Sequence, residues 1–199
     1  MLKKLLLAVA ALIAILLGVI ATRPSTYKVT RTANIAAPPE RVFAMLNDYR
    51  KWADWSPWAK IDPNMKVTYE GPASGAGASY AWVGNSDVGE GKMTTLESRP
   101  NEYLKIKLEF IKPFESNSIT EFTLKPEGSA TTVSWDMTGE ATFMTKAFTL
   151  VASMDSMVGP DFEKGLSRLK QLAESAAARR LSESPAQFAR ARLPRRAIP

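Results

Sequence analysis

The chain has 199 residues, 45% of them hydrophobic and 23% charged, and it contains neither cysteine nor histidine. This length and composition are typical of one globular domain with a core of its own. The missing residue types exclude disulfides, Cys and Ser-His-Asp nucleophilic systems and the usual zinc sites. Acid–base chemistry would depend on carboxylates, tyrosine, lysine or arginine, and no metal or organic cofactor is indicated.

The formal charge of +6 lies at the two ends of the chain. Residues 176–199 carry a net +5 and Lys3 with Lys4 add +2, so that residues 23–175 carry a net −1. A near-neutral body without a basic cluster argues against nucleic-acid binding. We interpret residues 177–199 as a disordered, Arg-rich tail, because they are rich in Arg, Ala, Ser and Pro and show no sustained periodicity.

Residues 5–21 form an uninterrupted run of apolar residues and glycine. As a helix the run would be about 25 Å long, which is the short limit for crossing a bilayer. We favour an uncleaved anchor within residues 1–22, with the following domain outside the cytoplasm. The alternative is a cleaved signal, with 19–21 (Val-Ile-Ala) as the cleavage site and a secreted or periplasmic product.

Alternating apolar and polar residues predict seven strands beyond this segment. The clearest phase is that of 102–111, where Leu104, Ile106, Leu108 and Phe110 alternate with charged residues. The predicted strands are 26–36, 65–71, 77–84, 89–98, 102–111, 118–124 and 131–141.

Two short helical segments are predicted after the first strand, and one long helix after the last. The first begins at Pro38-Pro39 and presents Val42, Phe43, Leu46 and Tyr49 on one face, and the second contains three tryptophans. From 143 to about 178 the apolar residues recur every three or four positions, with a kink or a division into two helices expected at Gly159-Pro160. The stripe consists of Phe148, Val151, Met154, Val158, Phe162, Leu166, Leu169 and Ala173.

The predicted order is strand, two short helices, six strands and one long helix, which gives an α+β fold. A seven-stranded antiparallel sheet needs a cover for its inner face, and only the final helix is long enough. A curved sheet around a helix leaves space between them for a ligand.

This order, together with several sequence motifs, resembles the SRPBCC (START-like) superfamily over roughly residues 26–174. The motifs are Asp48 with Trp52, Trp55, Ser56, Pro57 and Trp58; Tyr80, Ala81, Trp82, Gly84 and Asn85; Gly89 through Met93; 109–114 (Glu-Phe-Ile-Lys-Pro-Phe); Trp135 with Gly139; and Gly159 with 161–166. The chain is most similar to bacterial polyketide cyclase/dehydrase and lipid-transport-like proteins. The resemblance implies a helix-grip domain over 23–176 with an internal hydrophobic cavity, but no single activity.

Aromatic and methionine side chains are the candidates for lining this cavity, because ligand pockets are mostly apolar. The candidates are Tyr80, Trp82, Phe110, Trp135, Phe143, Phe148, Met154 and Met157. Each of them could equally be an ordinary residue of the hydrophobic core that contacts no ligand. Trp52, Trp55 and Trp58 form either a lid at the cavity mouth or a plug that closes one end of the sheet.

The positions of the carboxylates in the sequence give little evidence for a catalytic site. Glu109 and Asp136 fall on the polar phase of their strands, and Asp48 suits a backbone cap. Glu70, Asp155 and Asp161 lie where the cavity ends are expected, but nothing pairs them in the sequence. We therefore expect a membrane-tethered carrier of a lipid, isoprenoid or aromatic polyketide-like ligand. A cyclase or dehydratase, or an interaction module like the heat-shock ATPase activators, is the alternative.

Overall fold

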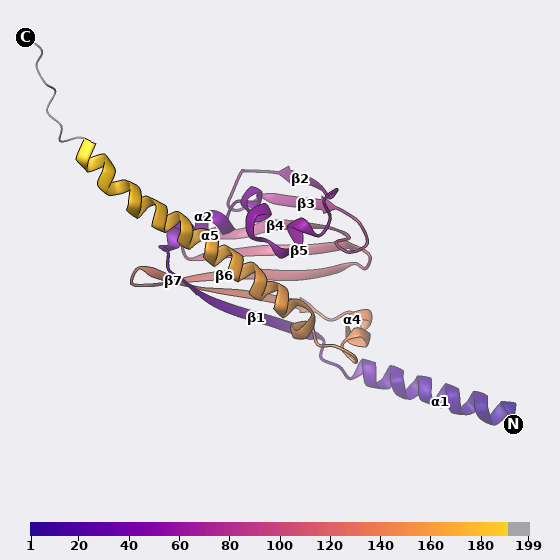
Figure 1. Ribbon diagram of the computed structural model, residues 1–199. Helices are drawn as coiled ribbons and strands as arrows, with labels where there is room; N and C mark the ends of the chain where they lie inside the picture. The colour runs from indigo at the N-terminus through magenta and orange to yellow at the C-terminus, as the bar shows by residue number, and fades with distance from the viewer. Residues whose placement is uncertain (191–199) are drawn as a thin grey trace, which may run out of the picture.

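In the computed structural model, a seven-stranded antiparallel sheet curves around the C-terminal helix, while the N-terminal helix projects away from this body (Figure 1). The structure describes residues 1–190, with side chains described as far as Ser175. The strands follow the order β1-β7-β6-β5-β4-β3-β2. Their bounds are β1 (Thr26–Ile35), β2 (Lys66–Glu70), β3 (Ser79–Val83), β4 (Glu90–Arg99), β5 (Tyr103–Lys112), β6 (Ser116–Glu127) and β7 (Ala130–Glu140). The seven predicted strands and the helix-grip architecture are confirmed.

Strand alternation determines which face of the sheet is buried. On β7, Val133, Trp135 and Met137 are at most 5% exposed, and their odd-numbered phase continues to Gly139. In the register between β6 and β7, these residues lie opposite the buried residues of β6; Phe122, for example, pairs with Trp135. The inner face is therefore a continuous apolar surface across neighbouring strands.

A run of short helical elements covers the middle of this inner face. The run comprises α2 (Pro39–Leu46), η1 (Tyr49–Lys51), α3 (Trp52–Trp55) and η2 (Pro57–Lys60). The predicted apolar face of α2 and η1 is confirmed, since its four residues are at most 6% exposed. Asp48 caps η1 by accepting a hydrogen bond from the Arg50 backbone N–H at 3.0 Å.

The C-terminal helix α5 (Met154–Arg190) completes the cover. The Phe162 ring stacks on the Trp135 ring, with centroids 4.0 Å apart and planes inclined by 9°. Leu166, Leu169 and Ala173 continue the stripe and are at most 2% exposed. The long helix thus closes the core along the residues that the periodicity predicted from Phe162 onward.

The predicted division at Gly159-Pro160 is wrong. The helical region divides at residues 149–153, between α4 (Phe143–Phe148) and α5, while Gly159 and Pro160 lie inside α5. The Ser153 hydroxyl accepts a hydrogen bond from the Ser156 backbone N–H at 3.1 Å, so this serine begins the new helix. Phe148 and Val151, which were predicted to belong to the buried stripe, are 51% and 93% exposed.

Gly159 has a packing role instead. A methyl group at this position would overlap the guanidinium of Arg31, which crosses from β1 to the helix. That guanidinium pairs with Asp155 at 2.6 Å and Glu163 at 2.6 Å, and its hydrogen bonds hold the pKa of the Asp155 carboxyl below its ordinary value. The glycine therefore makes room for the ion pairs that fasten the start of α5 to the sheet edge.

The disordered, Arg-rich tail over residues 177–199 stays a prediction. Helix α5 is described as far as Arg190, beyond the domain boundary expected at 176. The remainder of the predicted tail, residues 191–199, lies outside the described residues.

Candidate functional site

The inner face of the sheet is not covered evenly from end to end. One cross-strand row, made by register pairs, is at most 5% exposed: Val29, Met137, Thr120, Ile106 and Thr95. The short helices reach as far as this row, because the Tyr49 hydroxyl lies 2.9 Å from the Thr95 hydroxyl and hydrogen-bonds to it. Beyond this row the cover by the short helices becomes incomplete, although the Tyr49 ring still lies 5.9 Å from the Tyr80 ring and the Arg50 guanidinium lies 4.9 Å from the centre of the Tyr69 ring.

The next row forms the floor of the candidate site. It crosses all seven strands through register pairs: Tyr27, Gly139, Ser118, Leu108, Met93, Tyr80 and Tyr69. Its members Tyr27, Leu108, Met93 and Tyr80 are half-buried, although they share the inward phase of the fully buried row. We call this uncovered part of the inner face the open end.

Beyond this row the apolar floor continues on β3 and β5. The rings of Trp82 and Phe110 meet edge to face at a centroid distance of 5.8 Å. Between these two strands, a methyl group at Gly91 would overlap the Trp82 ring, so glycine allows the indole to lie flat over β4. The Trp82 indole N–H donates to the Val88 carbonyl at 3.0 Å, which fixes the ring.

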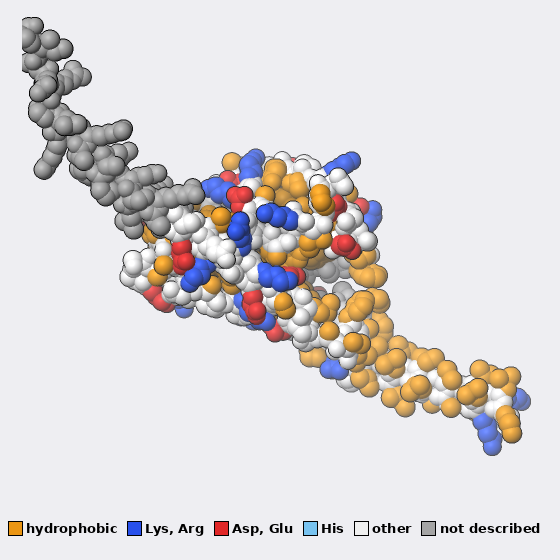
Figure 2. Space-filling model, viewed as in Figure 1, with side chains coloured by type: hydrophobic (Ala, Val, Ile, Leu, Met, Phe, Trp, Pro, Cys, Tyr) orange, Lys and Arg blue, Asp and Glu red, His pale blue; other side chains and the backbone are white. Residues whose placement is uncertain are grey.

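The opposite wall of the open end comes from the beginning of α5. Met154 and Val158 are half-buried and pack against the edge of the core. Figure 2 shows a hollow between the body of the sheet and the α4 region, bordered by hydrophobic side chains. In the same orientation, Figure 1 shows β6 on one side of this position and the α4 region on the other.

The polar groups at the open end are hydroxyls, apart from the Arg50 guanidinium, which lies 4.9 Å from the centre of the Tyr69 ring. The Tyr27 and Ser118 hydroxyls hydrogen-bond to each other at 2.8 Å. Burial, with a smaller effect from Tyr69, raises the pKa of Tyr80 to about 12. At neutral pH the Tyr80 hydroxyl therefore keeps its proton and can donate a hydrogen bond, but it cannot act as a base.

A second depression, of about 520 Å³, lies at the same end of the sheet but involves mainly the outward phase of the strands. Its outward row joins Lys28, Thr138, Ile119 and Lys107. Both lysines are already paired, Lys28 with Asp136 at 3.0 Å and Lys107 with Glu109 at 2.6 Å. We therefore place the candidate site on the inner face, where apolar side chains lack a cover.

Residues 26–174 match the protein family described as polyketide cyclase/dehydrase and lipid transport. The chain belongs to this family. The family description covers both enzymes and lipid carriers of apolar compounds, so membership indicates the class of ligand more closely than the reaction. A comparison with curated protein sequences finds no match.

Solved structures with the same fold support the architecture of this polyketide cyclase/dehydrase and lipid transport domain. Protein CV1439 from Chromobacterium violaceum is 20% identical, with a TM-score of 0.53 over 76% of this chain and 99% of its own. The di-domain ARO/CYC protein StfQ from the steffimycin biosynthetic pathway is 11% identical, with a TM-score of 0.59 over 77% of this chain and 52% of its own. The Aha1 dimer from Colwellia psychrerythraea is 14% identical, with a TM-score of 0.53 over 74% and 96%. At these identities the similarity shows the fold alone.

The sequence candidates fall into three places in this family domain. Tyr80 and Phe110 lie half-buried on the floor of the open end, Trp82 beside them is buried at 8% exposure, and Met154 lies on the opposite wall. Trp135 is only 2% exposed, beneath Phe162 and beside Trp55, so it lies in the covered core. The remaining three are exposed at the rim: Phe143 (53%), Phe148 (51%) and Met157 (49%).

The tryptophan cluster is part of the cover. Trp52 and Trp55 are 5% and 2% exposed, and their indole N–H groups donate to the Leu46 and Met45 carbonyls. Trp58 is half-buried, and its ring meets those of Trp135 and Phe162 edge to face. The structure therefore places two of the three lid candidates in the core and the third at its surface.

Six of the seven residues in the floor row were not among the sequence candidates for the cavity: Tyr27, Gly139, Ser118, Leu108, Met93 and Tyr69. Leu108 falls on the inward phase that was recognised in β5, but the phase alone did not show that this position is uncovered.

Among the described side chains, the Trp135 indole N–H is the one buried polar group without a hydrogen-bond partner. No group of three acidic side chains that could hold a metal ion is found in the described part of the chain.

Proposed function

We propose that the open end binds a hydrophobic small molecule and that the protein acts as a carrier for it. The observation on which this proposal depends is the uncovered floor row, where half-buried Tyr27, Leu108, Met93 and Tyr80 continue the inner face beyond the cover. Apolar surface left in contact with water favours an apolar ligand by roughly 25 cal/mol per Å² buried, before ordering costs. A lipid, an isoprenoid or an aromatic polyketide-like compound has this character.

The hydroxyl groups at the floor would orient such a ligand. Tyr80 can donate a hydrogen bond, and the Tyr27–Ser118 pair offers a further donor and acceptor. A few polar groups in an apolar pocket give orientation and specificity, while the affinity comes from apolar contact. The favoured ligand therefore has a long or wide apolar body with one small polar group.

The positions of the carboxylates favour a carrier over a cyclase or dehydratase. All six weighed from the sequence pair with a basic side chain: Asp48 with Arg50, Glu70 with Lys92, Glu109 with Lys107, Asp136 with Lys28, Asp155 with Arg31 and Asp161 with Lys164. An enzyme alternative would have to use the Tyr80 hydroxyl as a proton donor. A group with a pKa of about 12 is poorly matched to proton transfer near neutral pH.

We further propose that α1 (Leu2–Ala21) tethers the carrier to a membrane. This helix has a mean hydropathy of 2.7 over its most apolar 18 residues, and 6% of that window is buried in the protein. It is the one helix in the described part of the chain that is long and apolar enough to span a bilayer. A tether keeps the site close to the membrane in which apolar ligands reside.

Native mass spectrometry of the full chain, released from detergent micelles, tests the carrier proposal. We expect an added mass in near-stoichiometric amount, which organic extraction identifies as a compound with an extended apolar body. A chain that carries no such mass, and that also fails to take up a fluorescent fatty acid, would contradict the proposal. An enzyme that releases its product would show neither retention nor a single bound species.

A further inference from the structure

Six large apolar side chains around the open end are exposed to solvent. We call them the mouth patch, and they come from the β5–β6 turn, from α4 with the turn after it, and from the first turn of α5. They are Phe114 (54%), Phe143 (53%), Met144 (44%), Phe148 (51%), Val151 (93%) and Met157 (49%). Exposed apolar residues that gather in one place mark a surface that meets another apolar surface.

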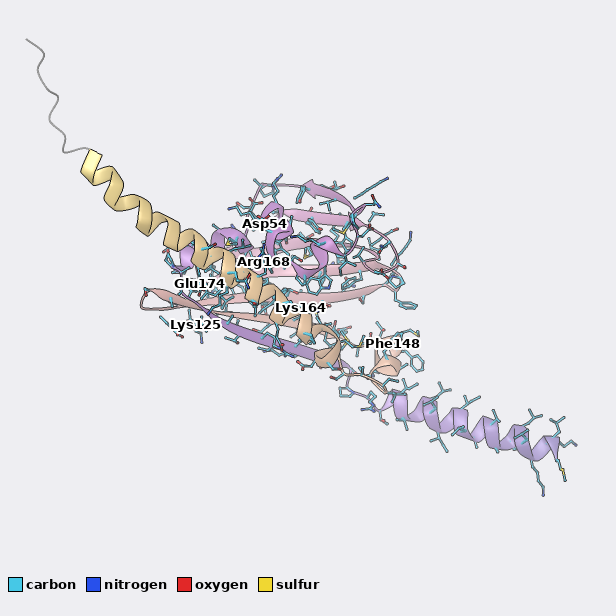
Figure 3. The ribbon with its side chains drawn as sticks, in the orientation of Figure 1. Asp54, Lys125, Phe148, Lys164, Arg168 and Glu174 are labelled. Atoms are coloured by element: carbon cyan, nitrogen blue, oxygen red, sulfur yellow. The ribbon has the colours of Figure 1, made fainter. Side chains whose placement is uncertain are left out.

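Two segments of the patch lie side by side. The Phe114 and Phe148 rings lie 6.5 Å apart between centroids, so the β5–β6 turn and α4 share one apolar surface. In Figure 3, Phe148 lies on α4 at the end of the molecule where α1 joins, whereas Glu174 marks the opposite end of the covered part of α5. The mouth patch therefore faces the same end of the protein as the N-terminal helix.

Helix α1 contacts α4, and its residue Ile20 is 5% exposed. Ser25, four residues after the last residue of α1, is fixed beside α4: its carbonyl accepts from the Ala141 N–H at 2.8 Å and its hydroxyl accepts from the Lys146 ammonium at 3.1 Å. Four residues span at most about 14 Å even when fully extended. While these bonds hold, the end of α1 therefore stays within about this distance of Ser25, which lies beside the helix that carries part of the mouth patch.

This geometry, which rests on the proposed membrane anchor and not on ligand binding, points to the bilayer as the partner of the mouth patch. We propose that the mouth patch docks on the surface of the membrane that α1 spans, so that the open end faces the lipids. The headgroup region on each side of the hydrocarbon core is only about 5–8 Å thick. A patch held so close to the end of a spanning helix lies at this interface, where aromatic and aliphatic side chains are stabilised.

Docking in this way would give the ligand a path that avoids water. The rim residues Phe143, Phe148 and Met157 lie between the bilayer and the floor of the open end. An apolar molecule would leave the membrane, pass these side chains and reach Leu108 without exposing its surface to solvent. The expected substrate class is therefore one that partitions into bilayers.

The depth of the mouth patch in a membrane can be measured directly, because the chain has no cysteine and accepts a single spin label. Val151→Cys places the label on the patch, at a side chain so exposed that its replacement disturbs no packing. Ser129→Cys is the matched control, on the exposed β6–β7 turn at the opposite end of the sheet. The full chain is reconstituted in phosphatidylcholine vesicles containing phosphatidylglycerol and recovered by flotation.

We expect the label at position 151 to be several-fold more accessible to oxygen, which concentrates in lipid, than to a water-soluble nickel chelate. At position 129 the preference is expected to reverse. Floated protein whose label at 151 is as accessible to nickel as that at 129 would overturn the inference and assign the patch to a protein partner. Failure to float with vesicles would overturn the anchor and the docking together, whereas loss of ligand retention with a lipid-exposed label at 151 would overturn only the carrier proposal.

Discussion

Replacement of Phe162 by alanine is expected to lower the free energy of unfolding by about 3–5 kcal/mol. The Phe162 side chain is 1% exposed and stacks on Trp135, whose other neighbours are Trp55, Trp58 and Phe122. Removal of the ring leaves a cavity between α5 and the sheet that the surrounding rings cannot easily fill. Denaturant unfolding of the full chain in mild detergent, followed by near-UV circular dichroism, measures the change.

Phe148→Ala is the matched control, because it removes the same ring from a position that is 51% exposed. We expect it to change the free energy of unfolding by no more than about 0.5 kcal/mol. Equal losses for the two variants would contradict the distinction between a covered core at Phe162 and an uncovered rim at Phe148.

Leu108→Gln is expected to weaken the binding of a fluorescent fatty acid by about tenfold or more. Leu108 is half-buried on the floor row, where an apolar ligand would lie on its side chain. An amide buried there without a partner costs roughly 1–3 kcal/mol. The middle of this range, about 2 kcal/mol, corresponds to a roughly thirtyfold increase in Kd, and its lower end to about fivefold. Equilibrium titration of the full chain in vesicles, with the free ligand determined separately, gives the Kd.

Ile119→Gln provides the control for this binding experiment. Ile119 is also half-buried on a neighbouring strand, but it lies on the outward phase and lines the outer depression. We expect its Kd to stay close to that of the unaltered chain. A larger loss for Ile119→Gln than for Leu108→Gln would move the ligand site to the outer face of the sheet.

The fold could be predicted from the sequence because apolar and polar residues alternate strongly along the strands and because the last helix has a long stripe of apolar residues. The β5 phase of Leu104 and Ile106, and the α5 stripe from Phe162 to Ala173, correspond to buried residues in the structure. Neither local pattern depends on distant parts of the chain. The helix-grip arrangement then follows from the need to cover one apolar face of the sheet.

The candidate site was harder to predict, because the exposure of a side chain on the sheet depends on which distant segments of the chain pack over it. Trp135 and Tyr80 are both inward-facing aromatics, yet Trp135 lies beneath α5 and α3, whereas Tyr80 is only partly covered, by Tyr49 of η1. No spacing in the sequence reveals how far that cover reaches. The break before α5 was missed for a related reason, since helical spacing continues through Phe148 and Val151 while the Ser153 cap starts a new helix.

The central claim is that an apolar ligand lies on the inner face at the open end, and photo-crosslinking tests it most directly. A diazirine fatty acid is bound to the full chain in vesicles, activated by light, and located by peptide mass mapping. We predict adducts in β3 and β5 around Tyr80 and Leu108, and at the start of α5 around Met154. Adducts confined to α1, or to the outward-facing Lys28 and Ile119, would contradict the account.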